Sequence, residues 1–104
     1  MKLSVIIPVY NEVKTFDKVL AQVSSVSIRG VEKEIVVVDD FSTDGTRERL
    51  SKLKDKGVNV FFHDANMGKG SAVRTGLSHA TGDVVIFQDA DMEYDPDDYE
   101  KLVM

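Results

Sequence analysis

The chain has 104 residues, of which 42% are hydrophobic, and this suits one small domain with a modest core. Its formal net charge of −5 and the lack of a basic run argue against a nucleic acid or an anionic membrane surface as partner. There is no cysteine, hence no disulfide or zinc–thiolate site, and no apolar stretch approaches the roughly 20 residues of a membrane span, so we expect a cytoplasmic protein.

Short apolar runs alternate with segments of helical spacing along the whole chain. Runs rich in β-branched residues predict strands at 3–9, 34–39, 58–62 and 84–87. We expect Pro8 to end the first strand, because proline cannot donate to a sheet ladder. Helices are predicted over 16–26, with a stop at Arg29–Gly30, over 46–53, and on a third face formed by Val73, Leu77 and Ala80. A fourth helix is expected to begin at Pro96 and to run to Met104.

This alternation of strands and helices predicts an α/β fold. Strands that are apolar throughout need cover on both faces, so we expect a three-layer α/β/α arrangement around a mostly parallel four-stranded sheet. Ligands of open parallel sheets bind beyond the carboxyl ends of the strands, where the strand order reverses. Polar residues gather after three of the predicted strands, at 10–12, 39–40 and 89–93, which points to a site at that edge.

Three acids follow the last predicted strand at alternate positions. Asp89, Asp91 and Glu93 would share one side of an extended chain and would repel one another. A hard divalent cation, Mg²⁺ or Mn²⁺, would relieve that repulsion and leave coordination sites for phosphate oxygens. The alternative is that the acids belong to a helix start, with Asp95 as N-cap before Pro96. That alternative explains the acids from Asp95 onward, but it does not explain Asp89 and Asp91.

The adjacent acids Asp39 and Asp40 end the second predicted strand. They could form a second metal pair, anchor a base or ribose, or cap the following helix, and we expect one to be functional and one to cap. Tyr10 could stack on a planar base or only cover the end of the sheet. His63 lacks a partner pattern and is given no catalytic role, and Met67 is interpreted as a packing residue.

The run Gly68-Lys69-Gly70-Ser71 has the wrong spacing for a phosphate-binding P-loop. His63 stands where the first glycine of that motif should be, and Gly70 follows the lysine. Two glycines before a helix would still expose backbone N–H groups, and Lys69 adds positive charge. An anion could therefore rest there, although a solvated lysine in a turn explains the same residues.

Five segments together resemble one protein family. They are PVYNE (8–12), VVVDDFSTDGT (36–46), NMGKG (66–70), GD (82–83) and QDADMEYDP (88–96). In this order they resemble family 2 glycosyltransferases, and within that family the polyprenyl-phosphate (dolichyl-phosphate) mannosyl- and glucosyltransferase branch. The resemblance covers essentially the whole chain.

The resemblance implies a GT-A fold, of which this chain would be the Rossmann-like half. It implies inverting transfer of a sugar from a nucleotide-sugar donor with Mg²⁺ or Mn²⁺. It also implies donor-binding roles for residues after several strands: Pro8, Tyr10 and Glu12 at the base and ribose, Asp39 on the base with Asp40 beside it, and Lys69 near the nucleotide. Asp89 and Asp91 would form the metal-binding DXD motif, with Asp91 catalytic, and Glu93 could be a further metal ligand.

Relatives in the family continue with an acceptor-binding half that nothing in this chain matches. We therefore expect residues 1–104 to be the half that binds a UDP- or GDP-linked sugar. We also expect them to self-associate through surfaces that the other half would cover. If the acceptor is a polyprenyl phosphate, the protein would act at the cytoplasmic face of a membrane.

Two other functions remain open from the sequence. A response-regulator receiver also has paired acids and a Mg²⁺ site, but its acids should close the first strand and here they close the second. A non-catalytic nucleotide-binding or assembly module would use the same fold without turnover.

Overall fold

The computed structural model describes residues 1–53 and 58–88. In that part, four strands and three helices alternate. The strands are β1 (Lys2–Val9), β2 (Glu32–Asp39), β3 (Asn59–Phe62) and β4 (Val84–Phe87). The helices are α1 (Phe16–Ser25), α2 (Thr46–Leu53) and α3 (Lys69–His79). The expected helix at 96–104 lies outside the described residues.

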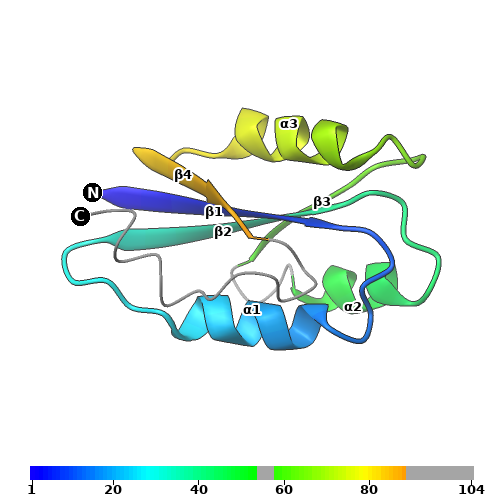
Figure 1. Cartoon of the computed structure of the whole chain (residues 1–104), viewed down its shortest axis with the longest axis horizontal. Coiled ribbons are helices and arrows are strands. Elements are labelled where there is room, and N and C mark those ends of the chain that lie inside the picture. Colours follow the sequence, from blue (N-terminus) through cyan, green and yellow to red (C-terminus); the bar gives the residue numbers. More distant parts are fainter. Residues whose placement is uncertain (54–57, 89–104) are drawn as a thin grey trace.

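The four strands form one parallel sheet in the order β3-β2-β1-β4. α1 and α2 cover one face and α3 covers the other, which confirms the three-layer α/β/α prediction (Figure 1). The chain moves outward from β1 to β3 and then returns to place β4 on the other side of β1. The strand order therefore reverses between β1 and β4, and this is where open α/β sheets bind their ligands.

The core has two parts, because side chains alternate across the sheet. The odd residues of β1, Leu3, Val5, Ile7 and Val9, face α1 and α2, where Phe16, Val19, Val23 and Leu50 pack on them. On the other face Ile6, Val36 and Val38 pack with Ala72 of α3. All of these side chains are buried.

The buried face of α3 differs from the predicted one. Its buried residues are Ala72 and Gly76, whereas Leu77 is 45% exposed. A Cβ atom added to Gly76 would lie 2.5 Å from Cγ2 of Ile6, so α3 approaches the sheet more closely than a side chain at residue 76 would allow. The prediction chose the most hydrophobic side chains of the helix. The contact between α3 and the sheet depends instead on two of the smallest residues, Ala72 and Gly76.

Two predicted boundaries were also wrong. α1 ends at Ser25, four residues before Arg29, and the Nζ atom of Lys33 donates to the carbonyl oxygens of Val23 and Val26 at that end. Pro8 does not end β1, which continues to Val9 and pairs there with β2. The backbone of the even residues of β1 faces β4, as the bond from Gln88 N–H to the Ile6 carbonyl shows. Residue 8 also faces β4, and proline has no N–H to donate. It therefore restricts hydrogen bonding between β1 and β4 but does not affect hydrogen bonding between β1 and β2.

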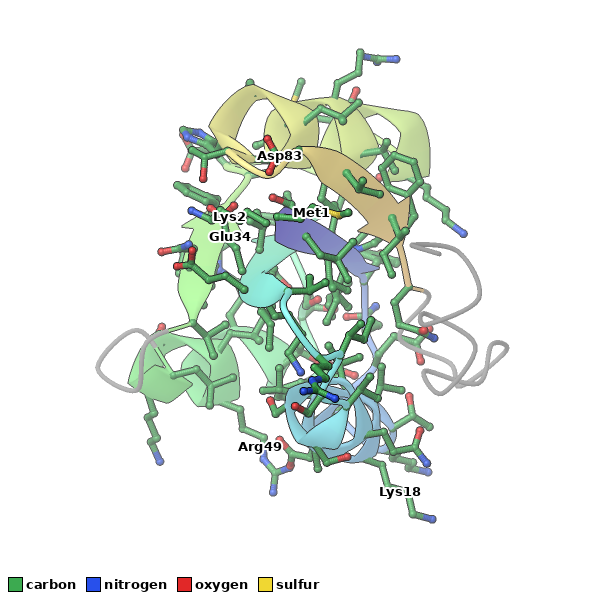
Figure 2. The ribbon with its side chains drawn as sticks, turned by 90° about the vertical axis from the view of Figure 1, so that its left-hand side faces the viewer. Met1, Lys2, Lys18, Glu34, Arg49 and Asp83 are labelled. Atoms are coloured by element: carbon green, nitrogen blue, oxygen red, sulfur yellow. The ribbon has the colours of Figure 1, made fainter. Side chains whose placement is uncertain are left out.

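Polar contacts link the strands at the amino edge of the sheet. This edge lies opposite the carboxyl ends of the strands, where the sequence predicts the site. Glu34 accepts hydrogen bonds from the Ser4 hydroxyl at 2.7 Å and from the Thr81 N–H at 3.0 Å. The backbone N–H of Lys2 donates to Asp83, and Figure 2 shows Lys2, Glu34 and Asp83 at this edge. In the described ranges no helix is both long enough and apolar enough to cross a membrane.

Candidate functional site

Loops that follow β1, β2 and β3 meet at the carboxyl edge of the sheet. The N–H of Asn11 donates to the Ser42 hydroxyl at 2.9 Å, and the Asn11 side chain accepts from the Thr43 N–H at 2.7 Å. The Asp40 N–H donates to the Val9 carbonyl, and the His63 N–H donates to the Asp39 carbonyl, both at 2.8 Å. These bonds hold the three loops in one layer and so fix where their side chains lie.

Asp39 and Asp40 are adjacent in sequence and point to opposite faces of the sheet. Asp39 follows Val37 toward α1 and α2, and Asp40 follows Val38 toward α3. Both side chains are buried. This alternation gives the two acids different partners and therefore different roles.

Asp39 is held through one of its two carboxylate oxygens. Its Oδ2 accepts from the Ser42 N–H at 3.1 Å and lies 3.6 Å from Nη1 of Arg47. Its Oδ1 is buried, and no residue in the described part of the chain donates a hydrogen bond to it. Buried carboxylate oxygens are almost always paired, so this one is a candidate acceptor for a ligand.

Arg47, at the start of α2, was not singled out from the sequence. Its Nη1 donates to the His63 carbonyl at 2.8 Å in addition to its ion pair with Asp39. Its guanidinium carbon lies 4.9 Å from the ring centre of Phe62 and 5.5 Å from that of Phe41. Two cation–π contacts and a hydrogen bond therefore fix this guanidinium against the Asp39 carboxylate. A basic residue at the second position of a predicted helix carries no signal that would have marked it.

Asp40 connects β2 to the loop before α3. Its Oδ1 accepts from the Met67 N–H and its Oδ2 from the Gly68 N–H, each at 2.8 Å, and Oδ1 also lies 2.9 Å from Nδ1 of His63. Burial by itself would raise the pKa of Asp40, but these hydrogen bonds to the charged form outweigh it, and the pKa lies below its ordinary value. One acid of the pair was expected to cap the following helix, and this was wrong for Asp40, because Asp40 accepts from the loop before α3 while Asp44 accepts from the Thr46 N–H at the start of α2.

His63 is buried and bonded through both ring nitrogens, although no partner for it was expected from the sequence. Its Nε2 lies 2.8 Å from the Thr75 hydroxyl of α3, while Nδ1 contacts Asp40. Strand alternation could have revealed this contact. If β3 is extended by one residue, His63 lies on the same face of the sheet as Phe61. Asp40 lies on that face too, because it follows Val38 at alternate spacing.

The donor-binding residues expected after β1 lie at this same edge. Pro8 is buried within β1, and Tyr10 is 46% exposed in the following loop. Glu12 is half-buried and accepts from the Thr15 hydroxyl at 3.1 Å, and its backbone carbonyl accepts from the Phe16 N–H. An exposed aromatic ring at a strand end has a free surface on which a planar base can stack.

The glycine-rich loop is less open to an anion than its sequence indicated. The N–H of Gly68 donates to Asp40 and to Asn66, so it cannot also bind an anion. Gly68 has a φ of 91°, a left-handed conformation that favours glycine. Lys69 is exposed as the first residue of α3. Met67 is 60% exposed, so its interpretation as a packing residue was wrong.

The expected metal ligands Asp89, Asp91 and Glu93 lie outside the described residues. Within 1–53 and 58–88, no three potential ligand side chains come together as a metal site. Gln88, the last described residue, is buried and bonded to β1 at the carboxyl edge. The described part of the chain therefore ends at the same edge as Tyr10 and Asp39.

A cavity of about 240 Å³ lies elsewhere, between the end of α1 and the start of β2. Leu3, Val26, Ile28 and Lys33 are among its lining residues, which places it toward the amino end of the sheet. It is therefore separate from the site at the carboxyl edge.

An open parallel sheet with a strand-order reversal and buried acids at its carboxyl edge defines an α/β protein of the open, doubly wound kind. Residues 4–104 match the model of the family described as Glycosyl transferase family 2. The chain belongs to this family, as its motifs indicated.

Individual relatives agree with this assignment. The chain is 39% identical over 104 residues to a dolichol-phosphate mannosyltransferase of Pyrococcus furiosus, and the match covers 99% of this chain and 29% of that protein. The structure resembles S. aureus TarS with a TM-score of 0.82 at 34% identity, covering 99% of this chain and 31% of that one.

Two further structures contain ligands. TarS was also solved in complex with UDP-GlcNAc, and that structure has a TM-score of 0.77 at 36% identity and covers 88% of this chain and 27% of that one. The mannosyltransferase PcManGT of Pyrobaculum calidifontis, in complex with GDP-Man and Mn²⁺, has a TM-score of 0.79 at 32% identity and covers 92% of this chain and 29% of that one. The chain thus spans less than a third of the length of these relatives.

Proposed function

We propose that residues 1–104 bind the nucleotide-sugar donor of a glycosyltransferase at the carboxyl edge of the sheet. The observation that carries this proposal is the buried Oδ1 of Asp39, which has no hydrogen-bond partner among the described residues and lies at the carboxyl end of β2, the strand next to β1. A base N–H would satisfy this oxygen, and the exposed ring of Tyr10 on the neighbouring loop could stack on the base. Membership of glycosyl transferase family 2 supports the same assignment.

The donor's diphosphate would be held by a divalent cation. Asp89, Asp91 and Glu93 supply oxygen ligands of the kind that Mg²⁺ and Mn²⁺ prefer, and Asp91 is our candidate for the catalytic ligand. When bound, such a cation neutralises negative charge on the diphosphate leaving group. Lys69, exposed at the start of α3, could add positive charge near the nucleotide. Asp40 would act indirectly, by fixing the loop before Lys69.

The transfer itself would be inverting, with a polyprenyl phosphate as acceptor. Similarity to a dolichol-phosphate mannosyltransferase supports this acceptor class. A phosphate oxygen is already an anionic nucleophile, so the acceptor would need no strong general base to activate it.

Calorimetric titration with nucleoside diphosphates tests the proposal. We expect the chain to bind UDP or GDP in the presence of Mn²⁺ and to lose that binding in Asp91→Ala while its thermal unfolding is unchanged. Asp83→Ala is the matched control, because Asp83 is an exposed acid at the opposite edge of the sheet. Unchanged Mn²⁺-dependent binding in Asp91→Ala would contradict the proposed metal site.

A further inference from the structure

The donor site contains a feature that bears on which base it accepts. Asp39 lies opposite Arg47, and its two carboxylate oxygens are not equivalent. Oδ2 is engaged by the Ser42 N–H and by the Arg47 guanidinium, and in the described part of the chain Oδ1 alone lacks a donor. The carboxylate therefore offers a ligand one acceptor and not two.

Nucleobases differ in how many donors they present to such a group. Adenine and cytosine carry an unprotonated ring nitrogen at the corresponding position, which a carboxylate repels. Uracil presents one ring N–H. Guanine presents a ring N–H together with an adjacent amino group, and this pair needs both oxygens of a carboxylate. One free oxygen matches uracil, and it would leave the amino group of guanine without an acceptor.

Arg47 is the residue that keeps the second oxygen engaged. Its guanidinium cannot easily turn away, because it lies over the rings of Phe41 and Phe62 and donates to the His63 carbonyl. Phe41 has a φ of 65°, a left-handed conformation that is uncommon for a residue with a side chain. The loop thus keeps an unfavourable backbone geometry at the point where the Phe41 ring covers Arg47.

We propose that Arg47 is a specificity-determining residue that makes the donor site select uridine over guanosine diphosphates. This inference rests on the proposed function, because it assumes that the base contacts Asp39. Asp39 is fully buried, so that contact requires the side chains that cover Oδ1 to move aside. The half-exposed rings of Tyr10 and Phe41 lie on the loops at this edge.

The test is calorimetric titration of the chain with UDP and with GDP, each with Mn²⁺. We expect wild type to bind UDP about tenfold or more tightly than GDP, which corresponds to one unpaired buried donor. In Arg47→Gln, Oδ2 keeps its hydrogen bond from the Ser42 N–H but loses the guanidinium, so it can accept one further hydrogen bond, and this ratio should fall to within about threefold. Arg49→Gln is the matched control: it removes the same charge from α2, at a site paired with Asp17 and away from Asp39, and should leave the ratio unchanged.

The possible results separate the two proposals. GDP binding as tight as UDP binding by wild type, or a ratio in Arg47→Gln equal to that of wild type, would overturn the role of Arg47 while the donor site stands. Binding of neither nucleotide by wild type would overturn the proposed function and this inference with it. If Arg47→Gln does not fold, the wild-type ratio decides alone, and Arg47→Lys, which keeps a cation near Asp39, should retain the preference for UDP.

Discussion

Individual residues at the carboxyl edge have roles that follow from which face of the sheet they point to. Asp39 and Asp40 are neighbours in sequence, yet Asp39 contacts α2 through Arg47 and Asp40 holds the loop before α3. His63 shares the second role, since it contacts Asp40 and the Thr75 hydroxyl. The site is thus supported from both layers of helices.

Replacing Asp40 should destabilise the chain even though the change is small in volume. In Asp40→Asn an amide nitrogen replaces one of two oxygens that each accept a backbone N–H, so one donor loses its partner. We expect a loss of about 1–3 kcal/mol in the free energy of unfolding, measured by urea denaturation at pH 7. Asp64→Asn, at an exposed acid in the adjacent loop, is the control and should change stability by less than about 0.5 kcal/mol. Equal effects of the two substitutions would show that Asp40 is not the anchor of this loop.

At the scale of elements, the position of α3 is set by small residues. Ala72 and Gly76 face the sheet, and Gly76 allows the helix to lie directly on Ile6. This close approach carries the loop that precedes α3 back to the carboxyl edge, where Asp40 accepts from the Gly68 N–H and His63 contacts the Thr75 hydroxyl of α3. The chain between β3 and α3 therefore depends on packing at the middle of the helix.

Adding a methyl group at residue 76 should disturb this packing. A Cβ atom there would meet three side-chain carbons of Ile6, the nearest at 2.5 Å, and neither the helix nor the sheet can easily move. We expect Gly76→Ala to cost about 1–3 kcal/mol, measured as the free energy of unfolding. Gly70→Ala, on the same helix, meets only the flexible end of Arg74 at 3.6 Å and should be neutral or slightly stabilising. A Gly76→Ala variant as stable as Gly70→Ala would rule out the tight contact.

At the scale of the whole molecule, buried or bonded carboxylates at both edges of the sheet depend on being ionised. At the amino edge, burial would raise the pKa of Glu34, but its bonds from Ser4 and Thr81 outweigh this and lower the pKa. At the carboxyl edge, the pKa values of Asp40 and Asp44 are lowered in the same way, against burial, by hydrogen bonds to their charged forms. At acid pH these carboxylates become protonated, so the hydrogen bonds that they accept at both edges of the sheet should weaken together.

The pH dependence of stability follows from the direction of these shifts. A carboxylate whose pKa is lower in the folded than in the unfolded chain stabilises the fold fully above the unfolded value of about 4. That stabilisation is lost as the pH falls through the folded values. We expect the free energy of unfolding to drop between about pH 5 and pH 2, and to drop less steeply in Glu34→Gln than in wild type. The exposed Glu48 of α2 provides the control, and Glu48→Gln should show the wild-type pH profile.

Self-association stays a prediction. In the described part of the chain, β3 and β4 are the two edges of the sheet, and Phe87 of β4 is 47% exposed. Edge strands with exposed apolar side chains favour pairing between copies. Light scattering over a range of concentrations should show a rising mass, and Phe87→Lys should suppress it. A constant monomer mass at high concentration would count against this expectation.

The sequence by itself determined the order of strands and helices, the parallel sheet and the edge that carries the site. These properties follow from local patterns, because apolar runs and helical spacing report which surfaces must be buried, and parallel strands bring their carboxyl ends to one edge. Only the tertiary structure decided the separate roles of Asp39 and Asp40, the contacts of Arg47 and His63, and the buried face of α3. Those depend on distant partners, such as residue 40 with residue 67 and residue 6 with residue 76, whose contacts no local pattern specifies.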